Sequence, residues 1–128
     1  MAATLTAAGL CGLVFMWLSW RVVQVRTSAK VMIGDGGDAV LLSRIRAHAN
    51  FAEYVPILLI LILAIELSLR ATPPLLMGVA VALPVFRVMH ALGMGRPSPN
   101  PLRALGTLGT WAALVGLSGW ALVNASGY

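Results

Sequence analysis

The chain has 128 residues, of which 59% are apolar and only 10% are charged, and its mean hydropathy is +0.90. Because a soluble domain is normally about a quarter charged, this composition excludes a water-soluble globular protein, and its low charge also excludes a disordered one. At ~20 apolar residues per crossing, the chain has room for about four membrane helices and no second domain. The net charge of +5 therefore indicates membrane topology and not a nucleic-acid partner.

The first half of the chain predicts two membrane spans. The first covers residues 4–26, a segment with no charged residue before Arg21. A glycine-rich turn follows, and Asp38 is expected to cap the start of the second span, residues 39–69. This second helix is longer than the hydrocarbon core of a bilayer, so its charged first half is expected at the membrane edge.

The second half of the chain predicts two further spans, residues 73–92 and 101–124. Thr72 is expected to cap the third span, and Asn100 the fourth, with Pro101 as its first helical residue. The segment from Gly93 to Asn100 reads as a connector because of its glycine and proline content. The predicted fold is an all-α, integral membrane four-helix bundle in a single domain.

The distribution of basic residues predicts the orientation of this bundle. Eight of the nine basic residues, all except Arg70, lie in or next to the connectors 27–38 and 93–100. With four spans these two connectors share one side of the membrane, and the positive-inside rule assigns that side to the cytoplasm. We therefore expect a multi-pass protein of a bacterial inner membrane, in contact with membrane lipid.

Polar residues near the cytoplasmic ends of the spans need an explanation, because ionisable groups at membrane depth are costly. Arg46, Asn50 and Glu53 follow one another at spacings of four and three residues, which places them on one face of the second span. The same layer receives residues from the other three spans: Arg26, Arg87, His90 and Arg103.

Two interpretations of this layer remain open. In the first, the arginines anchor the helix ends at the lipid headgroups, and Glu53 pairs with Arg46 or Arg87. In the second, the arginines, Asn50 and Glu53 form a site for an anionic ligand with carboxylates and an ammonium group, because guanidinium binds carboxylate in a bidentate manner. A zwitterionic peptide with excess negative charge fits such a site.

The two histidines carry weaker signals. His48 lies on another face of the second span and is expected to be an interfacial residue exposed to water. His90 shares a face with Arg87, and its simplest role is a hydrogen bond between helices. A haem held by both histidines is conceivable but has no other support in the sequence, and no metal is expected.

One segment resembles the signature of a known family. Residues 46–56, Arg-Ala-His-Ala-Asn-Phe-Ala-Glu-Tyr-Val-Pro, are similar to the pattern R-x-x-x-N-x-x-E-x-x-P of the MAPEG family, the membrane-associated proteins of eicosanoid and glutathione metabolism. The resemblance extends over nearly the whole chain and is greatest to the short bacterial members.

The resemblance implies a homotrimer with glutathione, the co-substrate, bound between neighbouring subunits near the cytoplasmic face. Arg103 matches the family arginine that stabilises the glutathione thiolate, and it is the catalytic candidate. The acceptor would be a lipophilic electrophile or hydroperoxide, which makes the protein a glutathione transferase or peroxidase. The glutathione-binding candidates are Arg26, Arg46, Asn50, Glu53, Tyr54, Arg87 and His90.

Departures from the family pattern leave alternatives. Ala104 and Thr107 stand where the eicosanoid enzymes have Ser and Tyr, which argues against prostaglandin or leukotriene synthesis. A protein that keeps the scaffold for binding or structure without turnover is the first alternative. A small multidrug exporter is the second, although the segment from Met1 to Lys30 lacks the acidic residue that those exporters carry in their first span.

Overall fold

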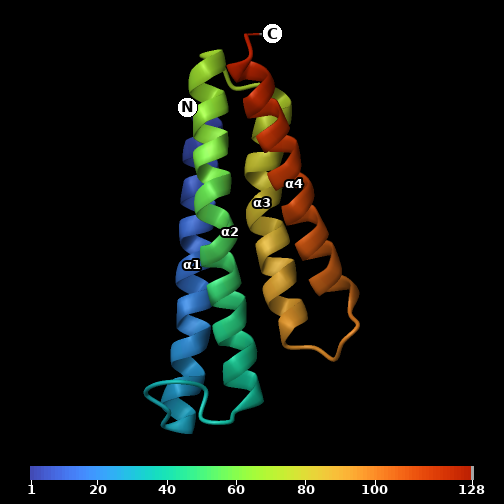
Figure 1. Cartoon of the computed structure of the whole chain (residues 1–128). Coiled ribbons are helices and arrows are strands. Elements are labelled where there is room, and N and C mark those ends of the chain that lie inside the picture. Colours follow the sequence, from blue (N-terminus) through green and yellow to red (C-terminus); the bar gives the residue numbers. More distant parts are fainter. Residues whose placement is uncertain (128) are drawn as a thin grey trace.

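Four long helices dominate the computed structural model, which describes residues 1–127 (Figure 1). They are α1 (Ala2–Ala29), α2 (Ala39–Leu69), α3 (Pro74–Met94) and α4 (Pro101–Ala125). Each helix is long and apolar enough to cross a membrane. The predicted all-α membrane bundle is thus confirmed, and the predicted spans agree with the observed helices to within three residues at every end.

Capping groups explain where α2 and α4 begin. The Asp38 carboxylate accepts a hydrogen bond from the main-chain N–H of Leu41 (2.9 Å), and the Asn100 side chain accepts one from Arg103 (3.0 Å). Both side chains satisfy a donor that the first turn of a helix leaves free. The expectation for Asp38 and Asn100 is therefore confirmed.

The start of α3 differs from the prediction. Pro73 occupies the N-cap position and makes no side-chain capping bond. Thr72, which was expected to cap this helix, donates its hydroxyl to the carboxylate of Glu66 on α2. The helix begins one residue later than predicted, so Thr72 lies before the N-cap position and its hydroxyl serves the charged acceptor on α2.

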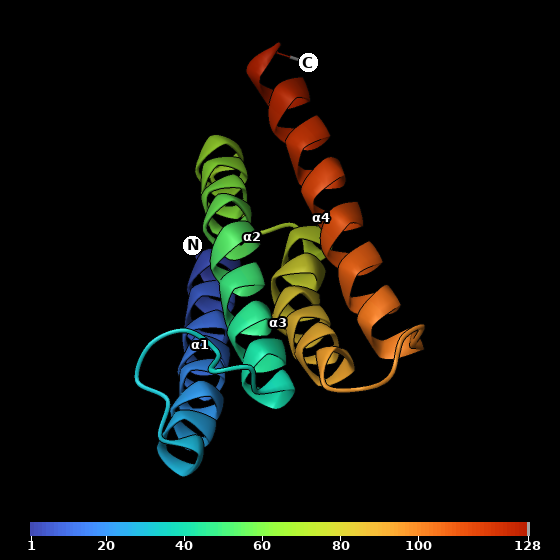
Figure 2. The same ribbon diagram turned by 60° about the horizontal axis from the view of Figure 1, so that its bottom comes forward.

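The helices alternate in direction, so that the loops 30–38 and 95–100 lie at the same end of the bundle (Figure 1). Helix α1 packs against α2 and α3, and α4 packs against the same two helices. Within residues 1–127, α1 and α4 do not touch, and they lie on opposite sides of the bundle in Figure 2. Helices α2 and α3 therefore form the centre of the molecule.

Glycines bring α3 and α4 unusually close together. A Cβ atom added at Gly106 of α4 would lie 2.6 Å from the main-chain nitrogen of His90 and from the carbonyl oxygen of Phe86. At Gly93, near the end of α3, it would lie 2.3 Å from the main-chain nitrogen of Arg103. Only glycine allows this backbone approach, which fixes the first turns of α4 against the last turns of α3.

The outer surface of the bundle is apolar. Large side chains such as Leu13, Leu75, Val115 and Leu122 are exposed, whereas the centre is filled by residues such as Leu58 and Ile62. Exposed leucine and valine on all sides suit contact with lipid chains and not with water. This surface fits the membrane location that the composition predicts.

Candidate functional site

A buried arginine lies at the centre of the polar layer. Arg87 of α3 is only 2% exposed, and its Nη1 donates to the Thr110 hydroxyl of α4 (3.1 Å). Its Nη2 donates to the side-chain oxygen of Asn50 on α2 (2.5 Å) and lies 3.0 Å from Nδ1 of His90. Since a guanidinium has only donors, the His90 Nδ1 accepts in this contact. Three helices thus meet at one cation.

The aromatic ring of Tyr54 lies beside the Arg87 guanidinium. The Arg87 guanidinium lies 5.8 Å from the centroid of the Tyr54 ring, and the indole N–H of Trp111 donates to the Tyr54 hydroxyl (3.0 Å). We call Asn50, Tyr54, Arg87, His90 and Thr110 the Arg87 cluster. Four of its five members were candidate site residues from the sequence; Thr110 was not, because a threonine in an apolar helix carries no sequence signal.

Four candidates lie outside this cluster, and three of them are on the surface. The side chains of Arg46, Glu53 and Arg103 are exposed on the surface of the bundle. Within residues 1–127, none of the three side chains has a hydrogen-bond or ion-pair partner. The expected pairing of Glu53 with Arg46 or Arg87 is therefore not observed, because Arg87 points into the bundle and takes neutral partners.

Arg26 stabilises the first loop. Its Nη1 donates to the main-chain oxygen of Gly34 (2.8 Å) and to that of Val31 (3.3 Å). These bonds hold the loop 30–38 against the end of α1. The structure therefore gives Arg26 a local role and does not include it in the Arg87 cluster.

The expectation for His48 was wrong. His48 is half-buried between α1 and α2, with its Nε2 3.1 Å from the Ser19 hydroxyl and its ring stacked on Phe15 at a centroid distance of 4.7 Å. The flat apolar faces of the imidazole make it a packing residue here. His48 and His90 thus belong to different contacts, and the described residues hold no group of three or more His, Cys, Asp or Glu residues that could bind a metal.

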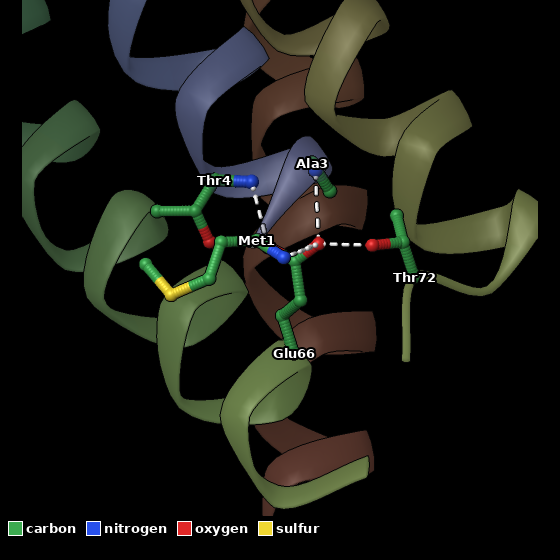
Figure 3. A network of polar contacts seen from close by, with 5 residues as sticks. All are labelled: Met1, Ala3, Thr4, Glu66 and Thr72. Atoms are coloured by element: carbon green, nitrogen blue, oxygen red, sulfur yellow. Dashed lines mark hydrogen bonds and ion pairs between the residues drawn. The ribbon is translucent and has the colours of Figure 1, made fainter. Parts of the chain in front are cut away.

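A second polar network was missed by the sequence analysis. Glu66 of α2 is 2% exposed, and its carboxylate accepts hydrogen bonds from the main-chain N–H groups of Ala3 (3.0 Å) and Thr4 (2.9 Å) (Figure 3). The hydroxyls of Thr4 and Thr72 also donate to it, and the Met1 amino group lies 3.3 Å away. The sequence feature that could have predicted this network is the single acidic residue, Glu66, in the apolar second half of α2. In the structure this residue lies at the end of the bundle where α1 begins.

The comparison with known families agrees with the motif and the fold. The MAPEG family model matches residues 4–123, a range that includes most of all four helices and every member of the Arg87 cluster. The chain belongs to the MAPEG family. No solved structure gives a significant match.

Two curated relatives support the location of this MAPEG protein. The inner membrane protein YecN of Escherichia coli strain K12 is 35% identical to the chain over 108 residues, which cover 84% of the chain and 81% of the relative. YecN of Escherichia coli O6:H1 strain CFT073 matches with the same identity and coverage. Together with the four apolar helices, this similarity makes the chain a multi-pass inner membrane protein.

Proposed function

We propose that this MAPEG protein binds glutathione and uses its thiolate to conjugate lipophilic electrophiles or to reduce hydroperoxides. The observation that carries the proposal is the position of Glu53. It lies 14 residues after Ala39, the first residue of α2, or about 21 Å along a helix of 31 residues. Its exposed carboxylate has no partner within residues 1–127. A charge at this depth requires a ligand or a neighbouring subunit.

The charges around this surface suit glutathione. Glutathione carries two carboxylates and one ammonium group. Guanidinium groups can bind the carboxylates, and Glu53 can bind the ammonium group. Arg46 lies on the same helix two turns before Glu53, and Arg103 lies in the first turn of α4. Both arginines are exposed and free within the described chain. We infer that the ligand lies against this outer surface.

The outward direction of these side chains also favours an oligomer, for which the family resemblance implies a homotrimer. A ligand on the outer surface of one subunit would face lipid on its other side, where its charges could not be solvated. A second copy of the chain would cover the ligand and supply further arginines. The Arg87 cluster would then support the site from inside the subunit, by fixing Asn50 and Tyr54 beside it.

Arg103 is the residue that we expect to act on the sulfur. A guanidinium near the thiol favours the thiolate, which is the nucleophile. In conjugation the sulfur forms a bond with an electrophilic carbon, and the leaving group departs with the electron pair. In peroxide reduction two glutathione molecules are oxidised to the disulfide, and the hydroperoxide is reduced to an alcohol and water.

The test is turnover in liposomes, with a chloronitrobenzene as the electrophile and an organic hydroperoxide as the oxidant. We expect Arg103→Ala to lower the rate roughly 100-fold, by analogy with the loss of one charge-stabilising donor at an active site. Arg103→Lys should recover part of the activity, and Arg70→Asn, which removes an arginine at the opposite end, should have wild-type activity. Equal rates in wild type and Arg103→Ala would contradict the role of Arg103.

A binding protein without turnover is the second candidate. Ala104 and Thr107 of α4 stand where the eicosanoid enzymes carry Ser and Tyr, so fewer hydroxyls are available near Arg103. Saturable glutathione binding combined with no reaction of any electrophile or hydroperoxide would favour this candidate over the enzyme.

A further inference from the structure

A polar cavity lies at the loop end of the bundle, outside the glutathione site proposed above. Its volume is about 380 Å³, and it lies between the end of α1, the start of α2 and the loop after α3. Three arginines line it, one from each of these segments: Arg21, Arg44 and Arg96. The remaining lining residues are Ala39, Val40, Ser43, Met94 and Gly95.

The positive charge in this cavity is not compensated. None of the lining residues is acidic, and within residues 1–127 no carboxylate forms an ion pair with any arginine. Two buried guanidinium nitrogens, Nη1 of Arg21 and Nε of Arg44, have no hydrogen-bond partner. Unsatisfied buried donors are costly, and their presence beside an open cavity points to an acceptor that binds there.

Two of the three guanidinium groups, those of Arg21 and Arg44, are held in place by their surroundings. Arg44 donates through Nη1 to the main-chain oxygen of Arg21 (2.8 Å) and more weakly to the Gln24 side chain (3.4 Å). The Arg21 guanidinium lies over the Trp17 ring, 4.8 Å from its centroid. These contacts reduce the entropy that the two side chains would lose when they bind an anion.

The start of α2 adds to the positive potential. Ala39 and Val40, the first two residues of this helix, line the cavity. The first N–H groups of a helix lack partners within the helix and favour an anion. The nearby Asp38 carboxylate is directed to the N–H of Leu41 and does not line the cavity.

We propose that this cavity binds a phosphate group, namely that of an anionic phospholipid in the cytoplasmic leaflet. Three guanidiniums and a helix start suit a group with several acceptor oxygens, such as phosphate. The loop end of the bundle is the end that the positive-inside rule assigns to the cytoplasm, where headgroups of anionic lipids gather.

The test is native mass spectrometry of the full chain released from nanodiscs of phosphatidylglycerol and phosphatidylcholine. We expect the wild type to retain phosphatidylglycerol in preference to phosphatidylcholine. Arg21→Gln and Arg96→Gln should each weaken the retention about fivefold, the effect of one basic residue near an anionic surface. Lys30→Gln, which removes an exposed charge from the same end but not from the cavity, should retain the lipid as the wild type does.

Two results would overturn the proposal. If Lys30→Gln weakens the retention of phosphatidylglycerol as much as the arginine variants do, the retention depends on the overall positive charge of this end of the protein and not on the cavity. Binding of inorganic phosphate to the protein in pure phosphatidylcholine nanodiscs, with the same dependence on Arg21 and Arg96, would assign the cavity to a soluble phosphate. Arg96 is exposed in a loop, and within residues 1–127 its side chain forms no hydrogen bond or ion pair, so Arg96→Gln remains informative even if Arg21→Gln fails to fold. Neither result depends on glutathione binding.

Discussion

Arg87 and Glu53 are two charged residues at similar depth in the bundle, but they differ in burial and in the partners of their side chains. Arg87 is buried and uses Asn50 and Thr110 as neutral partners, so that its charge holds three helices together. Glu53 is exposed and has no partner within the described residues, so that its charge contributes nothing to the fold of one subunit. We therefore expect the first residue to stabilise the fold, whereas the second has a role only in the proposed ligand binding.

Replacing Arg87 should therefore destabilise the protein. In Arg87→Ala, Asn50 and Thr110 lose a charged partner in the interior, which should cost about 3 kcal/mol. The melting temperature in detergent, followed by circular dichroism, measures this loss. Arg70→Asn, which changes an exposed arginine in a left-handed conformation that asparagine tolerates, should melt as the wild type does. A wild-type melting temperature for Arg87→Ala would contradict the assignment.

At the scale of helices, the junction around Glu66 determines how three elements meet. The carboxylate accepts from the first turn of α1, lies near the end of α2 and binds the Thr72 hydroxyl before α3. It therefore takes the place of an N-cap for α1, whose own cap residue, Met1, makes no such bond.

Glu66→Gln should weaken this junction. The neutral amide offers one acceptor oxygen where the carboxylate offers two, so at least one N–H or hydroxyl loses its bond. We expect a loss of about 1–3 kcal/mol, seen as a lower melting temperature and as faster hydrogen exchange in the first turn of α1. Glu53→Gln is the matched control and should leave both readouts unchanged. A melting temperature of Glu53→Gln as low as that of Glu66→Gln would contradict the expectation that only Glu66 stabilises the fold.

The contact between α3 and α4 should depend on particular glycines. Gly106→Ala places a methyl group against the backbone of α3, where neither side can move easily, and we expect a loss of about 1–3 kcal/mol. Gly119→Ala lies on the same helix with open space around it and should stabilise the helix by about 0.5–1 kcal/mol. Opposite shifts of the melting temperature confirm the close packing, whereas equal shifts contradict it.

The helices could be predicted from the sequence because apolar length and capping residues are local signals. Asp38 and Asn100 cap neighbours three residues away, so no tertiary knowledge was needed. The partners of Thr72, His48 and Glu66 could not be predicted, because each depends on which helix lies next to it. The spacing of Arg46, Asn50 and Glu53 indicated one face, but the structure turns Asn50 inward and the other two outward.

For the whole molecule, the proposed function requires more than one copy of the chain. Arg46, Glu53 and Arg103 lie on an otherwise apolar surface, and an isolated subunit would present them to lipid. The proposed ligand between copies of the chain would resolve this conflict. The loop end, with its arginine cavity, would then anchor each subunit to the anionic headgroups without taking part in the glutathione site.

Calorimetric titration of the detergent-purified protein with glutathione is the most direct test of the proposed binding site. We expect saturable binding in the micromolar-to-millimolar range for the wild type and loss of binding in Glu53→Gln and Arg103→Ala, with melting temperatures unchanged. Arg70→Asn should bind as the wild type does. No heat of binding in the wild type, or wild-type affinity in both variants, would contradict the account and leave the arginines as membrane anchors.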